Sequence, residues 1–344
     1  MNKLVFIGPC GGGKIPTNGA SVKNFYLIQT LRERFNSVIV IDTEYWRRNP
    51  FILLKLLFAV LKNPRAKFIV SANNMSSYRL IRIFDAIPAK REIYYWVIGG
   101  SIARWIKDGK VKSAPYRVLK MFIVEGNSMK DTLSECGFDN VITVPNFKNI
   151  SYIPDKQWLA NEDKVRFVFL SRIIPQKGCD YIIEAVKILN SKYSERFSVD
   201  FYGEISDDYS DIFLDKIDSL PNVSYKGFLD LRNPQNYDIL SRYDSMLFPT
   251  FWDGEGFPGI IIDAYIAGLP VIATDWSLNR DLIENGETGW IIEPKNAGVL
   301  AAKMEFVMNN KVEISQMSDL CQSKAMNYDV HYVLNDGLFK IIGM

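Results

Sequence analysis

Short apolar runs alternate along the whole chain with segments in which apolar residues recur at helical spacing. Each apolar run is short enough for a strand, and most are rich in β-branched and aromatic residues. These runs predict strands at 4–8, 37–42, 67–72, 92–98, 121–126, 140–145, 165–171, 198–203, 223–228, 245–250, 270–275 and 289–294. Helical spacing predicts helices at 21–34, 51–62, 76–86, 179–192 and 260–267. Apolar strands that alternate with helices are typical of parallel sheets covered on both faces, so the pattern predicts an α/β fold.

The alternation restarts after Pro145-Asn146, which indicates a second domain. We therefore predict two doubly wound, Rossmann-like domains that face each other across a cleft. The N-terminal domain would cover 1–150 and the C-terminal domain 151–325. Segment 326–344 would be a C-terminal tail that could pack back on the N-terminal domain. Ligands of such sheets bind at the carboxyl ends of the strands, so we expect the site in the cleft.

Composition and charge support two domains with different partners. The chain has 344 residues, of which 48% are hydrophobic, enough for two full cores. Its net charge is only +2, but residues 1–150 carry +13 and residues 151–344 carry −11. The first domain is therefore expected to meet something anionic. We expect no nucleic-acid partner, because no known motif or interleaving of aromatic and basic residues accompanies this charge.

Cysteine spacing and hydropathy limit the protein class further. Cys10, Cys136, Cys179 and Cys321 are scattered and form no C-x-x-C, which argues against a disulfide framework or structural zinc. No apolar run reaches the roughly 18 residues of a membrane span, and the first apolar stretch is too short for a signal peptide. We expect a cytoplasmic protein, either soluble or peripheral on the inner face of the plasma membrane.

Segment 45–67 leaves two interpretations open. An apolar run from Phe51 to Leu61 is flanked by Trp46 and several Lys and Arg residues. Such a helix could lie in a membrane interface, where the anionic surface would be a partner. It could equally pack on the sheet of its own domain.

A glycine cluster follows the first strand and resembles a P-loop only in part. Gly8 to Lys14 reads G-x-x-x-x-G-K, but Ile15-Pro16 replaces the Ser or Thr that would hold Mg²⁺. A proline so close to the lysine also disfavours a helix that starts there. We expect the helix to open near Gly19, where its N-terminus would be a general anion site.

The second half carries the densest candidate chemistry. Arg172 and Lys177 lie in the loop between a buried strand and a helix, and together they could neutralise a diphosphate. A second loop, 253–259, contains Glu255 and runs through Pro258 into a helix that carries Asp263. Its glycines allow close approach of a ligand, and the amides at the helix start could bind an anion.

These residues resemble the retaining nucleotide-sugar glycosyltransferases of family 4, the group 1 transferases with the GT-B fold. That family's signature is a glutamate, seven residues, a second glutamate, an alanine and then glycine-x-proline. Glu255, Asp263, Ala264 and Gly268-Leu269-Pro270 match it, apart from the Asp at the second acidic position. The family's arginine and lysine before a glycine are matched by Arg172, Lys177 and Gly178, and Gly286 and Gly289 also fit.

The resemblance implies a role for each matched residue. Arg172 and Lys177 would stabilise the diphosphate leaving group, and Glu255 would hold the sugar and steady the transition state. Asp263 would hold the ribose. The backbone around Gly256, Phe257, Pro258, Gly259 and Ile260, together with Gly19, would bind the donor. Cations replace a metal, no cofactor is expected, and the anomeric configuration would be retained.

The sequence also departs from the family pattern at two further places. The family's histidine from the N-terminal domain is missing, since the single histidine is His331, and Gly99-Gly100-Ser101 is expected to occupy that region. Trp276-Ser277 replaces the family's glycine pair after the strand at 270–275. The sugar pocket is therefore expected to differ.

By this resemblance the protein would move a sugar from a UDP- or GDP-sugar to a glycan or polyprenyl-diphosphate-linked acceptor. Capsule or lipopolysaccharide synthesis would be its setting. Two alternatives stay open: a transferase that acts on a soluble small molecule, and a non-catalytic protein that binds nucleotide sugars.

Overall fold

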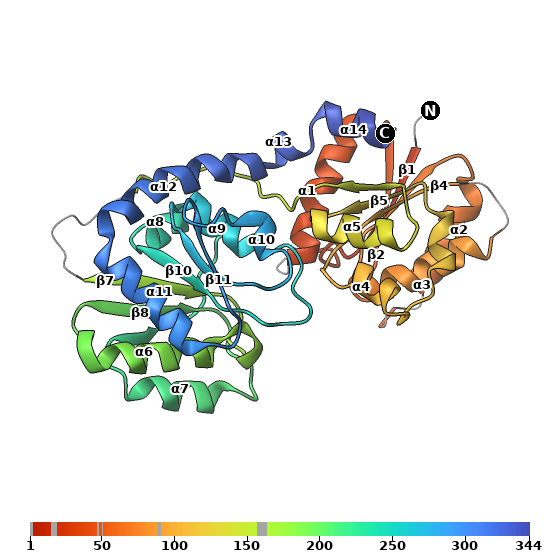
Figure 1. The fold of residues 1–344 in the computed structure, drawn as a ribbon. Helices are drawn as coiled ribbons and strands as arrows, with labels where there is room; N and C mark the ends of the chain where they lie inside the picture. The colour runs from red at the N-terminus through yellow and green to blue at the C-terminus, as the bar shows by residue number, and fades with distance from the viewer. Residues whose placement is uncertain (1–2, 15–18, 47, 50, 88–90, 157–163) are drawn as a thin grey trace. The chain divides into compact units, whose positions relative to one another are not determined.

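The chain forms two compact units in the computed structural model (Figure 1), which describes residues 3–14, 19–46, 48–49, 51–87, 91–156 and 164–344. Unit 1 comprises Met1–Asn149 and Val330–Met344, and unit 2 comprises Ile150–Asp329. Unit 1 is thus built from both ends of the sequence, and its second segment begins at Val330.

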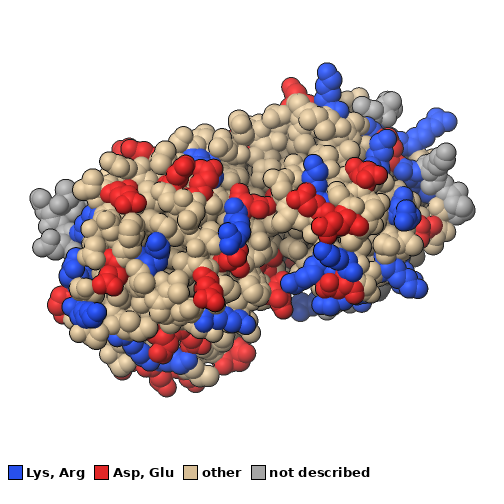
Figure 2. Space-filling model, in the orientation of Figure 1, with Lys and Arg blue, Asp and Glu red and all other residues tan. Residues whose placement is uncertain are grey.

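The two units divide the charge as well as the fold. Unit 1 has a net charge of +13 and unit 2 a net charge of −11. Figure 2 shows charged side chains of both signs over the visible face of each unit, with several Lys and Arg side chains projecting at the outer edge of unit 1.

The sheet of unit 1 is parallel and has the strand order β2-β1-β3-β4-β5-β6. Its strands are β1 (Lys3–Gly8), β2 (Ser37–Asp42), β3 (Lys67–Val70), β4 (Glu92–Trp96), β5 (Met121–Val124) and β6 (Val141–Thr143). All six coincide with predicted strands. Successive side chains point to opposite faces, and both faces of the inner strands β1, β3, β4 and β5 are buried, whereas the edge strands β2 and β6 are mostly half-buried.

Helices cover both faces of this sheet. On one face, α1 (Gly19–Arg34) packs with α13 (Val330–Val333) and α14 (Asp336–Ile342) against alternate residues such as Phe6 and Trp96. On the other face, Phe68 of β3 meets Phe84 of α3 (Asn74–Asp85), and Phe122 of β5 meets Phe138. The helices α2 (Phe51–Lys62), α4 (Ile102–Lys107) and α5 (Asn127–Glu135) complete the connections between strands.

Unit 2 contains a second parallel sheet, with the order β12-β11-β10-β7-β8-β9. Its strands are β7 (Val165–Leu170), β8 (Phe197–Tyr202), β9 (Val223–Tyr225), β10 (Ser245–Phe248), β11 (Val271–Thr274) and β12 (Gly289–Ile292). In the part of the chain that the structure describes, the twelve predicted strands are present and form two parallel sheets. The predicted α/β class, with two doubly wound, Rossmann-like domains, is thus what the structure shows for each unit taken by itself.

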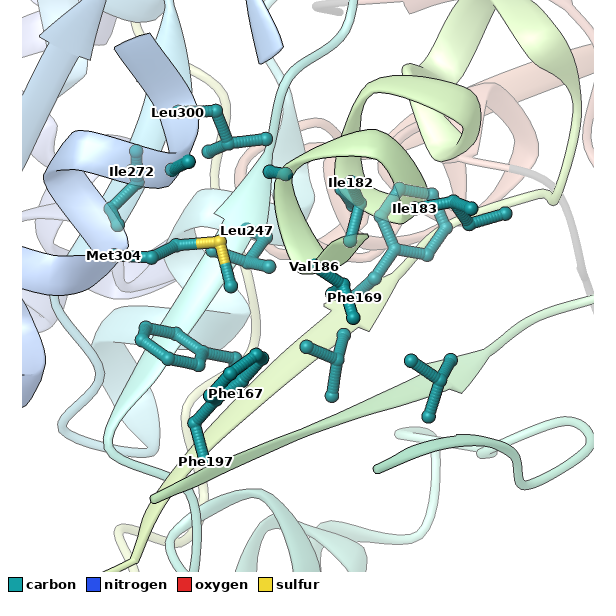
Figure 3. Packing of buried hydrophobic residues seen from close by; sticks show 14 of the residues in the cluster. Phe167, Phe169, Ile182, Ile183, Val186, Phe197, Leu247, Ile272, Leu300 and Met304 are labelled. Carbon is teal, nitrogen blue, oxygen red and sulfur yellow. The ribbon is translucent and has the colours of Figure 1, made fainter. Parts of the chain in front are cut away.

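The core of unit 2 is rich in phenylalanine. Figure 3 shows Phe167 and Phe197 from neighbouring strands beneath Val186 of α6 (Cys179–Tyr193) and near Met304 of α11 (Ala297–Asn309). Each such fully buried side chain contributes about 1.5–3 kcal/mol of hydrophobic stabilisation. The other helices of unit 2 are α7 (Ser210–Asp218), α8 (Tyr237–Leu240), α9 (Gly259–Ile266), α10 (Asn279–Leu282) and α12 (Lys311–Ala325).

The strand order of each sheet predicts where a ligand crevice would lie. In unit 2 the order reverses between β7 and β10, and in unit 1 it reverses between β1 and β3. Loops that leave the carboxyl ends of two such strands run in opposite directions and open a crevice, the usual ligand position in doubly wound sheets. The loops that matter most are therefore those after β7 and β10, and those after β1 and β3.

Candidate active site

The loops after β7 and β10 contact each other directly. Gly178 closes the first loop with a φ of +84°, and a Cβ there would lie 2.2 Å from the carbonyl oxygen of Pro249 in the second. The amide of Phe251 also donates to the carbonyl of Gln176 at 2.9 Å. Only glycine satisfies both the backbone conformation and the close approach, so Gly178 fixes the distance between the two loops.

This contact brings together two of the predicted catalytic residues. The ammonium of Lys177, from the first loop, lies 2.5 Å from Oε2 of Glu255 in the second loop. Their side chains are only 6% and 8% exposed. The hydroxyl of Thr250 donates to the same carboxylate oxygen at 3.0 Å. A charge removed from water needs such partners, so the pair holds both loops in one arrangement.

Arg172, the third predicted catalytic residue, is exposed beside the pair. Its guanidinium carbon lies 5.1 Å from the ring centroid of Trp252, and the ammonium of Lys177 lies 4.9 Å from the same ring. The negative face of an indole attracts cations at such distances. Trp252 therefore keeps two positive charges close together, and within the described residues no carboxylate forms an ion pair with Arg172.

The residues that replace the family's glycine pair hold the Glu255 loop from a third side. The indole nitrogen of Trp276 donates to the carbonyl of Trp252 at 2.8 Å. The hydroxyl of Ser277, a residue with a φ of +50°, donates to the carbonyl of Glu255 at 2.8 Å. Sequence reasoning noted this departure but missed its structural role, because only the fold brings the loop after β11 against the loop after β10.

The α9 helix starts after Pro258 and contains Asp263 in its second turn. Gly256, Phe257, Pro258, Gly259 and Ile260, the predicted donor-binding backbone, lead into this helix. Asp263 is buried, and its Oδ1 accepts a hydrogen bond of 2.6 Å from the hydroxyl of Tyr237 at the start of α8. Tyr237 was not singled out in the sequence, since nothing near it in the chain marks it as a partner of α9.

In unit 1, the glycine loop after β1 is bound by carboxylates of its own domain. The amides of Cys10 and Gly12 donate to Asp42 at 2.9 and 2.7 Å, and the amide of Gly11 donates to Glu44 at 3.2 Å. Burial, with Asp42 and Glu44 nearby, raises the pKa of the Cys10 thiol to about 12, so the thiol stays protonated. These three amides are therefore already satisfied without an external anion.

The predicted donor-binding residue Gly19 lies at the start of α1. It is exposed, and a Cβ added there would meet no atom within 4 Å. Ile15 and Pro16, which argued against a P-loop, lie outside the described residues. As for metals, the described part of the chain brings together no group of His, Cys, Asp and Glu side chains that could hold an ion.

Solved structures of similar fold define the class. The Anabaena protein Alr3699/HepE, solved in complex with UDP-glucose, superposes with a TM-score of 0.72, 16% identity and coverage of 99% of this chain and 100% of that chain. The lipopolysaccharide outer core galactosyltransferase WaaB superposes with a TM-score of 0.75 at 13% identity and covers 99% of both chains. The fold is thus that of GT-B glycosyltransferases.

Sequence comparison identifies the domain more closely. Residues 154–324, which lie almost entirely within unit 2, match the family model "Glycosyl transferases group 1". The capsular polysaccharide biosynthesis glycosyltransferase CapM of Staphylococcus aureus is 29% identical over 288 residues, which are 75% of this chain and 71% of that protein.

Other relatives match over shorter stretches. Three of the curated relatives are matched over only 37%, 54% and 35% of their own length. The Escherichia coli UDP-Gal:alpha-D-GlcNAc-diphosphoundecaprenol alpha-1,3-galactosyltransferase is 28% identical over 166 residues, 47% of this chain and 41% of that protein. Most of these relatives are named as glycosyltransferases, and several are named for capsular polysaccharide, amylovoran or colanic acid biosynthesis.

Proposed function

We propose that the protein transfers a sugar from a nucleotide sugar to a glycan or lipid-linked acceptor during synthesis of a surface polysaccharide. The observation that carries this proposal is the Lys177–Glu255 pair, buried where the loops after β7 and β10 meet. That position is where a doubly wound domain binds its ligand. The group 1 domain and the named relatives support the same activity.

In this proposal the two cations of the site stabilise the leaving group and the carboxylate binds the sugar. Arg172 and Lys177 would both stabilise the negative charge that develops on the nucleoside diphosphate as its bond to the sugar breaks. Cations that are fixed before the reaction stabilise such charge without further reorganisation. Trp252 holds both cations near one another, and Glu255 is oriented by Lys177 and Thr250 to hydrogen-bond sugar hydroxyls.

The donor and stereochemistry follow the family resemblance. We favour UDP over GDP as the nucleotide, because similar folds have been solved with UDP and with UDP-glucose. Asp263 would hold the ribose, and exchange of its bond with Tyr237 would accompany donor binding. The proposed reaction retains the anomeric configuration and needs no metal, since two cations occupy the role that a metal would serve.

The acceptor is proposed from charge and from one relative. Unit 1 has a net charge of +13, which suits the diphosphate of a polyprenyl-linked acceptor and an anionic membrane surface. The Escherichia coli relative is named for an acceptor linked to diphosphoundecaprenol. A soluble acceptor is the second candidate, and it would leave this charge without a partner.

A donor screen tests the proposal. UDP-, GDP- and ADP-sugars would be titrated by calorimetry, and sugar transfer or hydrolysis would then be measured with and without EDTA. We expect binding of a UDP-sugar and turnover that EDTA does not change. Binding without any turnover on lipid-linked or soluble acceptors would make the protein a nucleotide-sugar sensor. Strict dependence on added Mg²⁺ or Mn²⁺ would contradict the role given to Arg172 and Lys177.

A further inference from the structure

The α2 helix of unit 1 is apolar on two sides. One side, with Leu56, Ala59 and Val60, is buried against the rest of unit 1. The opposite side is open. Its exposed residues are Phe51 (67%), Leu53 (44%), Leu54 (60%), Leu57 (46%), Phe58 (58%) and Leu61 (60%). Single exposed apolar residues are ordinary, but a contiguous apolar face of this kind marks an interaction surface.

The exposed residues form one stripe rather than scattered points. Leu54, Leu57 and Leu61 are three and four residues apart, the spacing that returns to the same side of an α-helix. We call Leu53, Leu54, Leu57, Phe58 and Leu61 the α2 stripe. Lys55 and Lys62 are seven residues apart, so they follow one edge of the stripe, and the ammonium of Lys62 lies 4.3 Å from the ring centroid of Phe58.

The surroundings of the stripe are basic. Residues 45–84, which include α2 and all of α3 except its last residue, Asp85, contain eight Lys and Arg residues and no Asp or Glu. Lys55, Lys62, Arg65, Arg79 and Arg82 are all exposed. Among the described residues, neither Lys55 nor Lys62 forms an ion pair with a carboxylate. An apolar stripe edged by such lysines is complementary to a surface that is apolar inside and anionic at its boundary.

The geometry points to α2 as the helix by which unit 1 docks on an anionic membrane. The α2 stripe would enter the boundary between headgroups and acyl chains, while Lys55, Lys62 and Arg65 contact lipid phosphates. The helix would lie in the interface and not cross it: in the part of the chain that the structure describes, every helix is too short or too polar to span a bilayer. Docking would present unit 1 to a lipid-linked acceptor, a consequence that rests on the proposed function, whereas the docking itself does not.

A second copy of the chain fits the same stripe less well. In a twofold symmetric contact the α2 helices of both copies would meet through identical faces. The lysines along each stripe would then approach those of the partner, in a region of sequence without a single carboxylate. Such like-charge contacts oppose association, so charge complementarity favours the anionic lipid.

Vesicle sedimentation tests the docking, with phosphatidylglycerol–phosphatidylcholine vesicles compared against pure phosphatidylcholine. The stripe variant is Leu54→Ser/Leu57→Ser/Leu61→Ser. Its matched control, Ile188→Ser/Ile212→Ser/Leu214→Ser, changes three residues of unit 2 that are 50%, 51% and 40% exposed. We expect the stripe variant to bind anionic vesicles at least about tenfold more weakly and the control to bind as the unaltered chain does.

A charge variant separates the electrostatic contribution. Lys55→Gln/Lys62→Gln should weaken binding to anionic vesicles by about tenfold or more, and high salt should reduce binding of the unaltered chain in the same way. The control Lys187→Gln/Lys192→Gln removes two exposed lysines from α6 of unit 2 and should have no such effect.

Three results would overturn the docking. The first is that the unaltered chain binds neutral and anionic vesicles equally. The second is that the stripe variant binds anionic vesicles as tightly as the unaltered chain does. The third is that the unaltered chain is a dimer without lipid, whereas the stripe variant is a monomer. The last would assign the stripe to a second copy. Calorimetry with UDP-sugars on the same proteins distinguishes the two proposals. If neither the unaltered chain nor any variant binds a UDP-sugar, the proposed function is rejected, but the proposed docking is not.

Discussion

Among the described residues, each unit buries a Lys–Glu ion pair at the carboxyl edge of its sheet, and the two pairs differ in what they connect. In unit 1, Lys23 of α1 lies 2.6 Å from Glu125, directly after β5, and the side chains are 4% and 5% exposed. In unit 2, Lys177 and Glu255 lie 2.5 Å apart with 6% and 8% exposure. Only the second pair joins the loops of the two strands between which the strand order reverses.

The comparison shows that burial of an ion pair does not by itself indicate a site. Beside Lys177, the exposed guanidinium of Arg172 shares the ring of Trp252, which leaves positive charge open to a ligand. At the corresponding place in unit 1, the amides of the glycine loop are bound by Asp42 and Glu44. The same architecture is thus open to an anion in unit 2 and closed by its own carboxylates in unit 1.

The largest effects are expected from variants that break the two ion pairs. Lys177→Ala and Lys23→Ala each leave a buried carboxylate without its partner, so each should lower the free energy of unfolding by about 3–5 kcal/mol. Only Lys177→Ala should also lower kcat, by about 10²–10³-fold, in protein that remains folded. Denaturant unfolding and initial rates measure the two effects separately. An equal loss of kcat in both variants would end the distinction between the pairs.

Arg172→Ala should lower activity without the loss of stability. Its guanidinium is exposed and contacts Trp252, so the free energy of unfolding should fall by no more than about 1 kcal/mol. The kcat should fall by about 10²-fold because a cation of the leaving-group site is lost. Arg242→Ala, at another exposed arginine of unit 2, is the control for removal of charge. A near-normal kcat in Arg172→Ala would remove Arg172 from the site.

Lys156 gives unit 2 a distinct pH dependence. Burial lowers the pKa of its ammonium from 10.5 to about 8. Between these two pH values the lysine is protonated in the unfolded chain and neutral in the folded chain. Because a neutral lysine is not destabilised by burial, the free energy of unfolding should rise by about 3 kcal/mol as the pH rises from 8 to 10.5. Below pH 8 the penalty is complete. Lys156→Met should remove this contribution.

The measurement is the difference in unfolding free energy between the unaltered chain and Lys156→Met at several pH values. Taking that difference cancels the titration of other groups, such as the Cys10 thiol of unit 1. A difference that stays constant from pH 8 to pH 10.5 would show that the ammonium is hydrated in the folded protein.

The smallest expected effect concerns Asp263. Asp263→Asn removes the charge that would accept hydrogen bonds from the ribose, and Asp263→Glu adds a methylene in a buried position. Both should raise the donor KM by about tenfold and change kcat less, because ribose contacts are similar in ground and transition states. Tyr237→Phe removes only the partner at 2.6 Å and separates the two contributions. An unchanged KM in both Asp263 variants would place the donor elsewhere.

The sequence predicted the strands well because each is a short run rich in β-branched and aromatic residues, and the inner strands, such as β1 and β10, are buried on both faces. It could not predict that β7 lies beside β10, since strand order depends on pairing between segments far apart in the chain. For the same reason Lys177 and Glu255 were predicted separately, with different roles, and not as an ion pair. The position of the helix at 51–62 was predicted correctly, but the exposure of Leu54 and Leu61 required the structure.

Roles within the site were less accessible from sequence. Thr250 and Ser277 hydrogen-bond to Glu255, and Trp276 hydrogen-bonds to the carbonyl of Trp252. These contacts connect the loops after β10 and β11, and no spacing in the chain marks them. The family resemblance supplied candidate residues, and the structure supplied their neighbours. Their catalytic and binding roles stay predictions that the variants above test.

The core of unit 1 is completed by residues that are synthesised after the whole of unit 2. Val333, Phe339 and Ile342 pack with Leu4, Phe6 and Trp96 on one face of the sheet. During synthesis on the ribosome, unit 2 can complete its core while one apolar face of the sheet of unit 1 is still exposed to solvent. Such a waiting surface is open to chaperones and to aggregation. Unit 1 therefore cannot complete its native core until Val330–Met344 has been synthesised, although its first strand is synthesised first.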